Sequence, residues 1–195
     1  MKKLAKKSGF TLIEMLATLL ILVFLILGIG TGMDSAVRIY DEAKFEANSA
    51  SMANIVNTSL GDILRYSDNL TVVDPDVGYF VDSSNTRVPD VDLVFTNYEY
   101  AVRDAYFSLK DGSNNDDGIL RLRNLTNGTV VELVNTGAYP DMKIGDFHLV
   151  YTALGTDAAG NTIGGYFTVT YKVYSLKDSN LTKDVQYIVR CMNPV

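Results

Sequence analysis

The sequence opens with MKKLAKKSGFTLIEMLATLLILVFLILGIGTG, residues 1–32, and the rest of the chain is organised around this stretch. Four lysines precede Ser8-Gly9, and an apolar run then extends from Phe10 to Ile29. Roughly 20 predominantly apolar residues suffice for a membrane-spanning helix, and a lysine excess keeps its side of the membrane cytoplasmic. A plain anchor leaves Glu14 unexplained, because an ionisable group within a membrane segment is costly and usually functional.

A secretory signal peptide is one alternative for this stretch. Such a peptide has a basic start, an apolar middle and a small-residue cleavage site behind the apolar part. The lysines fit, but no A-x-A-like site follows Ile29, and the nearest candidate, Asp34-Ser35-Ala36, carries an acid. The pattern therefore does not favour cleavage behind the apolar run.

Cleavage in front of the apolar run accounts for the glutamate. If the bond after Gly9 is cut, Phe10 becomes a new N-terminus with a positively charged amine. Glu14 of one helix can then pair with the Phe10 amine of a neighbouring helix, and each charge offsets the other's cost of leaving water. Removing one partner of a buried ion pair is strongly destabilising, so the pair would select one register between packed helices.

The stretch SGFTLIEML, residues 8–16, resembles the signature of type IV prepilins and of type II secretion or competence pseudopilins. The resemblance extends to about Gly32. It implies a dedicated peptidase that cuts after Gly9 and methylates Phe10, and it implies that Glu14 docks the subunit onto a growing filament. The corresponding organisation is a basic leader over 1–9 that is removed, a transmembrane and assembly helix over 10–33, and an amphipathic helix with a globular head over 34–195.

The same resemblance predicts a structural filament subunit and not an enzyme. We expect a minor pilin, because a large head crowds a filament surface. A secretion or competence pseudopilin and a tip adhesin are the alternatives, and a membrane-anchored binding domain is the hypothesis outside the family. The implied partners are other pilin subunits, a prepilin peptidase, the pilus assembly machinery and, through residues 10–29, the membrane. The precursor would sit in the cytoplasmic membrane with its N-terminus in the cytoplasm, and the mature chain would join an extracellular pilus or pseudopilus.

The charge balance argues against a nucleic-acid-binding protein. The 195 residues include 17 basic and 23 acidic side chains, a net charge of −6. The leader holds four of the basic side chains and no acidic one, so the remaining chain has 13 basic and 23 acidic side chains, a net charge of −10. Nucleic-acid affinity rests largely on Lys and Arg neutralising phosphates, so we expect no general binding of nucleic acid.

The chain offers few side chains for catalysis or metal binding. His148 is the only histidine and Cys191 the only cysteine, so neither a zinc site nor an intramolecular disulfide is expected. Asp111, Asn115 and Asp117 supply hard oxygens and are the calcium candidates, but the EF-hand spacing and its closing glutamate are absent. We interpret this loop as an acidic turn and expect no cofactor.

Three glycines end the apolar run. Gly28, Gly30 and Gly32 each cost roughly 1 kcal/mol relative to alanine inside a helix, so together they predict a soft spot. They mark either a local melt or bend where the helix leaves the membrane, or close packing between small residues of neighbouring helices. From Asp34 to Tyr66 the apolar residues recur mostly every three to five positions, which predicts an amphipathic continuation of the helix from Phe10.

The rest of the chain predicts an antiparallel sheet. The predicted strands are 70–73, 78–81, 91–95, 119–123, 129–133, 146–154, 165–176 and 184–192, with a mixed stretch over 99–109. Asn127-Gly128 is a hairpin signal between two of them, and strict alternation in 165–176 predicts one buried and one solvent-facing side. The expected fold is α+β and pilin-like: a long N-terminal helix packed against an antiparallel β-sheet head.

Overall fold

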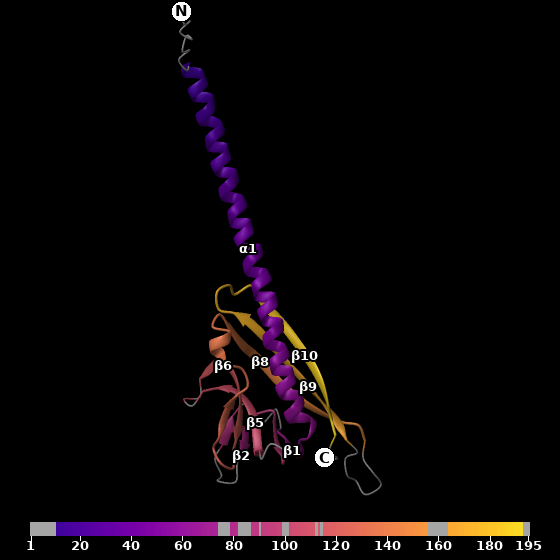
Figure 1. The fold of residues 1–195 in the computed structure, drawn as a ribbon. Helices are drawn as coiled ribbons and strands as arrows, with labels where there is room; N and C mark the ends of the chain where they lie inside the picture. The colour runs from indigo at the N-terminus through magenta and orange to yellow at the C-terminus, as the bar shows by residue number, and fades with distance from the viewer. Residues whose placement is uncertain are drawn as a thin grey trace, which may run out of the picture. The chain divides into compact units, whose positions relative to one another are not determined.

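The computed structural model of the protein describes residues 11–73, 79–81, 87–89, 91–98, 102–111, 113, 115–155 and 164–192. Within these residues the chain forms one long helix, one short 3-10 helix and ten strands (Figure 1). It divides into two compact units, Met1–Lys44 and Phe45–Val195. The second unit, which we call the head, contains all the strands.

The long helix α1 spans Leu12–Arg65, which confirms the predicted helix over 10–66. The first proline of the chain is Pro75, so nothing in this stretch removes a helical N–H. Every residue from 12 to 44 is exposed. In the head half of α1 the buried residues recur at helical spacing: Phe45, Ser49, Met52, Ala53, Val56, Leu60, Gly61, Ile63 and Leu64.

The last turn of α1 is closed by three separate parts of the head. Asn97 Nδ2 donates to the carbonyl of residue 63 at 2.6 Å, and the Ser67 hydroxyl donates to that of residue 64 at 2.7 Å. The Met192 N–H donates to the carbonyl of residue 65 at 2.8 Å. Cys191 beside it is buried, and its Sγ lies 3.4 Å from the Ser67 carbonyl oxygen. These bonds satisfy carbonyl groups that a helix end otherwise leaves free.

The first part of the head is a five-stranded antiparallel sheet of order β1-β4-β5-β6-β7. Its strands are β1 (Asp68–Val72), β4 (Leu93–Asn97), β5 (Val102–Lys110), β6 (Asp116–Asn124) and β7 (Val130–Glu132). A separate pair is formed by β2 (Tyr79–Val81) and β3 (Arg87–Pro89), and β3 was not predicted. The β6–β7 hairpin turns at Asn127-Gly128, as predicted, with Gly128 at a φ of 69°.

A 3-10 turn, η1 (Thr136–Ala138), leads to a three-stranded antiparallel sheet of order β10-β9-β8. Its strands are β8 (Met142–Ala153), β9 (Gly165–Ser175) and β10 (Thr182–Cys191). β8 begins four residues before its predicted start, because a bulge between Gly145 and His148 carries the strand past Asp146, which has a φ of 50°. Asp is one of the few residues that tolerate this left-handed conformation.

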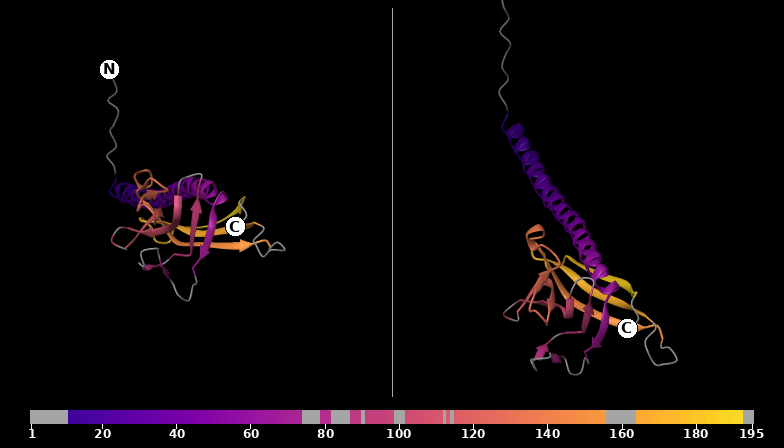
Figure 2. Two further views of the ribbon diagram at one scale, coloured as in Figure 1. Left: turned by 90° about the horizontal axis from the view of Figure 1, so that it is seen from below. Right: turned by 60° about the horizontal axis from the view of Figure 1, so that its bottom comes forward.

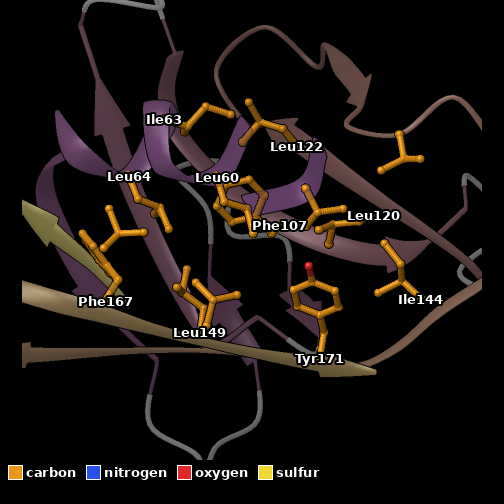
Figure 3. Packing of buried hydrophobic residues seen from close by; sticks show 14 of the residues in the cluster. Leu60, Ile63, Leu64, Phe107, Leu120, Leu122, Ile144, Leu149, Phe167 and Tyr171 are labelled. Atoms are coloured by element: carbon orange, nitrogen blue, oxygen red, sulfur yellow. The ribbon is translucent and has the colours of Figure 1, made fainter. Parts of the chain in front are cut away.

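One core joins α1 to both larger sheets. Figure 3 shows Leu60 and Leu64 of α1 among Phe107 and Leu122 from the five-stranded sheet and Leu149, Phe167 and Tyr171 from the three-stranded sheet. The head half of α1 lies along one face of the three-stranded sheet (Figures 1 and 2). The alternation predicted for β9 is confirmed, since its odd-numbered residues 167–173 are buried in this core and the even-numbered ones are not.

Tyr171 places a phenol at the centre of this core. Its hydroxyl donates toward Asn57 Oδ1 at 3.0 Å and lies 3.3 Å from the Ala53 carbonyl oxygen. Burial raises the pKa of Tyr171 above its ordinary value of 10.0. The strand β9 is thereby tied to α1 by a polar bond as well as by apolar contact.

Candidate functional site at the N-terminal helix

The first turn of α1 is closed by a reciprocal pair of side chains, Thr11 and Glu14. Glu14 Oε2 accepts the Thr11 backbone N–H at 2.9 Å and the Thr11 hydroxyl at 3.0 Å. The Thr11 hydroxyl oxygen in turn accepts the Glu14 N–H at 3.4 Å. This is a capping box, in which a Ser or Thr before the helix and a Glu three residues later satisfy free donors of the first turn. Glu14 therefore has a partner within its own chain.

The helix dipole adds to this arrangement. A carboxylate in the first turn of a helix interacts favourably with the partial positive charge of the unpaired N–H groups there. The Thr-x-x-Glu spacing before an apolar run is a sequence signature of a capping box, so the sequence alone could have predicted this cap. Sequence reasoning missed it because it considered Glu14 only as a charge in a membrane segment.

The apolar surface behind this cap is not covered by any of the residues that the structure describes. α1 contains an 18-residue window that is long and apolar enough to cross a membrane, and none of this window is buried. A signal sequence near an N-terminus can meet the same criteria of length and hydropathy. Because exposed apolar patches of this size mark membrane or protein contacts, the segment requires lipid or other chains around it.

The three glycines at the end of the apolar run lie inside α1, which continues through them to Arg65. Apart from the adjacent residues and the nearby backbone of α1 itself, a Cβ added at Gly28, Gly30 or Gly32 would meet no described atom within 4 Å. The glycines are thus not required by contacts within the subunit. Bending and close packing between helices both remain predictions for this segment.

Residues 4–30 match the family model of the prokaryotic N-terminal methylation motif. The chain carries the prepilin-type cleavage and methylation motif. The matched range contains the Gly9-Phe10 bond, which lies outside the described residues, and the capping box of Thr11 and Glu14. Searches of curated proteins and of solved structures find no match to this chain. The motif over residues 4–30 and the long helix packed on antiparallel sheets are a pilin-like arrangement, and proteins that carry this motif are typically structural subunits.

Two of the three calcium candidates, Asp111 and Asp117, have carboxylates that are engaged in other interactions. Asp111 Oδ1 accepts the backbone N–H groups of Ser113 and Asn115 at 2.8 and 2.9 Å. Asp117 binds both terminal nitrogens of the Arg121 guanidinium at 2.8 and 2.6 Å, and these hydrogen bonds lower the pKa of Asp117. Across the part of the chain that the structure describes, no three His, Cys, Asp or Glu side chains are arranged to hold a metal ion.

His148 borders a cleft of about 300 Å³ between the two larger sheets. Its side chain is exposed, and Nδ1 lies 3.7 Å from Asp92 Oδ2. The same Asp92 oxygen accepts the Leu149 backbone N–H at 2.8 Å and so joins β8 to the five-stranded sheet. Ser108 also lines the cleft, but its hydroxyl oxygen accepts the Lys110 N–H at 3.0 Å and makes no hydrogen bond to His148. The cleft therefore holds no activated nucleophile among the described residues.

Proposed function

We propose that this chain is a structural subunit of a type IV pilus or pseudopilus, a minor pilin that is cut after Gly9 and methylated at Phe10. The observation that carries the proposal is the coincidence of the methylation motif with the start of α1. The capping box begins the helix two residues beyond the scissile bond, and the apolar segment behind it is exposed along its whole length. Cleavage thus releases a preformed apolar helix with a charged end.

The capping box suggests how Glu14 serves both the free and the assembled subunit. Both hydrogen bonds from Thr11 go to Oε2, so within the described residues Oε1 remains able to accept another donor. In the filament, the Phe10 amine of a neighbouring subunit would bind this oxygen. The carboxylate would then close its own helix and neutralise a neighbour's N-terminus at the same time.

The course of assembly follows from these parts. The precursor is held in the cytoplasmic membrane by the apolar half of α1, a prepilin peptidase cuts it, and the helices bundle with those of other pilins in an extracellular filament. Removal of nine residues from 195 leaves a mature chain of 186 residues. The head of a chain this long would crowd the filament surface if every subunit carried it, which favours a minor subunit. Copy number in purified filaments tests this, and a subunit that makes up most of the filament would contradict it.

Mass spectrometry of the mature N-terminus tests the processing step. We expect a chain that begins with methylated Phe10, and Gly9→Val should retain residues 1–9 and run as a larger band. Gly28→Val is the matched control, because it is the same substitution inside the matched motif but away from the scissile bond, and it should be processed normally. A mature wild-type chain that still begins at Met1 would refute the proposal and favour an uncleaved membrane-anchored binding domain.

A further inference from the structure

The stretch of α1 that follows the apolar run carries three charges at equal spacing. Asp34, Arg38 and Glu42 are all exposed. Opposite charges four residues apart on a helix can pair within that helix. These side chains do not do so, and none of them makes an ion pair or a side-chain hydrogen bond with the described residues. All three are therefore available to a neighbouring molecule.

The order of the three charges selects one alignment between two parallel copies of α1. At equal height, each charge would lie beside the same charge of the other copy. A shift of eight residues would set Asp34 beside Glu42, again a pair of like charges. A shift of four residues, about 6 Å along the axis, sets Asp34 beside Arg38 and Arg38 beside Glu42. Of these alignments, only the four-residue shift brings opposite charges together.

The N-terminal motif requires the same shift. In the assembly proposed above, the Phe10 amine of one subunit binds Glu14 of its neighbour, which stands four residues further along the chain. Arg38 and Glu42 repeat this order, with the positive group first and the carboxylate four residues later. Two separate parts of α1 thus favour one stagger between neighbouring helices.

The two pairs also fall on the same side of a bundled helix. Parallel membrane helices mostly wrap around each other with a left hand, and the side that faces the partner then recurs every 3.5 residues. Arg38 follows Phe10 by 28 residues, which is four heptads. Glu42 follows Glu14 by the same 28 residues. The contact that begins at the motif therefore returns to the same side of α1 at Arg38 and Glu42.

The pair near Arg38 would lie in water. Arg38 stands nine residues beyond Ile29, the end of the apolar run, which is roughly 13 Å along the helix. Exposed ion pairs add little to affinity, but like charges brought together penalise a wrong alignment. This pair would therefore set the register of the helices, while the apolar run supplies most of the contact.

We propose that Arg38 of one subunit pairs with Glu42 of a second copy of this chain, as a register contact outside the membrane. The second copy is the occupant that the charges fit, because the chain carries both members of the pair at the spacing that the motif sets. The proposal rests on the proposed assembly through α1 and adds the residues that align two copies beyond the bilayer. Copies of this subunit would then lie side by side in the assembly.

Cysteine cross-linking in sheared filaments tests the alignment. Two full-length chains with different tags are expressed together, one with Arg38→Cys and the other with Glu42→Cys, and the filaments are oxidised mildly. We expect a cross-linked band of both tags. The native Cys191 is buried, and chains without an added cysteine give the background.

Two controls fix the offset and the side of the helix. Arg38→Cys on both tagged chains tests alignment at equal height. Tyr40→Cys with Lys44→Cys has the same four-residue offset, but both positions lie two residues further on and so on the opposite side of α1. Both residues are exposed. The pairing of positions 38 and 42 should exceed both controls at least about fivefold, because a disulfide needs a close approach of the two Cβ atoms.

A charge exchange tests the ion pair itself. Arg38→Glu should lower the amount of this subunit in filaments relative to membranes at least about fivefold, since it sets like charges side by side. Glu42→Arg should do the same, and the double variant R38E/E42R should return to within about twofold of the wild type. Lys44→Glu is the matched control, because it reverses a positive charge away from the contact, and it should assemble like the wild type.

The outcomes separate this contact from the role of the subunit. A wild-type chain that is processed at Gly9 and enters filaments, but cross-links no better at 38 and 42 than in the controls, overturns the contact and leaves the proposed function standing. A double variant as poor as the single ones also overturns it. A wild-type chain that is never cut at Gly9 overturns both proposals.

Discussion

Replacing Glu14 by glutamine separates its two proposed roles. The capping box accepts Gln as well as Glu at this position, so Glu14→Gln keeps the bond from the Thr11 N–H at 2.9 Å and loses only the charge. Glu14→Ala loses both. Thr11→Val weakens the cap because it removes the hydroxyl, but it leaves the Glu14 carboxylate charged. Thr11→Ser is its control, because serine retains the hydroxyl.

The magnitudes of the two effects differ enough to be told apart. Loss of a helix cap costs about 0.5–2 kcal/mol, which corresponds to about a 2- to 30-fold loss of incorporation. An amine buried without its carboxylate costs about 3–5 kcal/mol, which corresponds to more than about a 100-fold loss. We therefore expect Glu14→Gln and Glu14→Ala to be processed normally but nearly absent from filaments. Thr11→Val should be reduced much less.

The assay is the ratio of subunit in sheared filaments to subunit in membranes, measured by quantitative immunoblot, with the mature N-terminus checked by mass spectrometry. The decisive variant is Glu14→Gln. If it enters filaments as well as the wild type while Glu14→Ala does not, Glu14 acts through the cap alone, and the pairing of its charge with a neighbouring Phe10 amine is wrong.

Three further predictions concern the head and are measured by thermal or urea unfolding of the full chain in detergent. Asn97→Ala should cost about 1–3 kcal/mol by leaving a buried helix carbonyl unpaired, whereas Asn54→Ala at an exposed position of α1 should be neutral or slightly stabilising. Gly118→Ala should cost more than about 2 kcal/mol, because the φ is 75° and a Cβ would lie 2.4 Å from a side-chain carbon of β8; Gly155→Ala, which meets nothing within 4 Å, should not. Asp117→Asn should destabilise the head at pH 7. Its pKa is lowered from 3.8 by its arginine partner, so its stabilisation is present above that value and lost as the pH falls through the lowered pKa. A gap between Asp117→Asn and wild type that stays constant down to acid pH would contradict this assignment.

Elements with a strong local period were predictable from the sequence. The helix boundaries fell within two residues of α1, because an apolar run and then a helical stripe continue without proline up to residue 65. The strands β9 and β10 were predicted because their residues are rich in strand-forming types and alternate between apolar and polar, a pattern that indicates which side is buried. For the same reason the buried face of β9 was assigned correctly.

Pairing between distant strands was not predictable in this way. A local pattern identifies a strand but not its neighbour, so the division of the head into two larger sheets, with β1 beside β4, became visible only in the structure. The early start of β8 was missed because Gly145-Asp146 resembles a turn, whereas the fold absorbs it as a bulge inside the strand.

Some features of the N-terminal segment were likewise predicted from the sequence, and others became visible only in the structure. The roles of the Gly9-Phe10 bond and of Glu14 were predicted from residue types and from the resemblance to prepilins and stay predictions, and the family match over residues 4–30 contains both. The role of Thr11 depends on its hydrogen bonds to Glu14, three residues along the chain. It was not predicted, because only the charge of Glu14 was considered. The placement of Val150 and Ile188 in one row depends on the register of three strands, which no local pattern specifies.

The bond between Met192 and the end of α1 has a consequence for how the head folds. It joins residues 65 and 192, so the final turn of the helix is closed by a segment that is synthesised well after the helix itself. Contacts this distant in sequence form slowly, because the intervening loop must close before any bond repays the loss of entropy. While the chain is still emerging it lacks β10, so the part of the core that Val189 and Cys191 will cover stays exposed. The head therefore becomes a finished unit only once β10 has been synthesised, and loss of β10 would leave both the end of α1 and the core exposed.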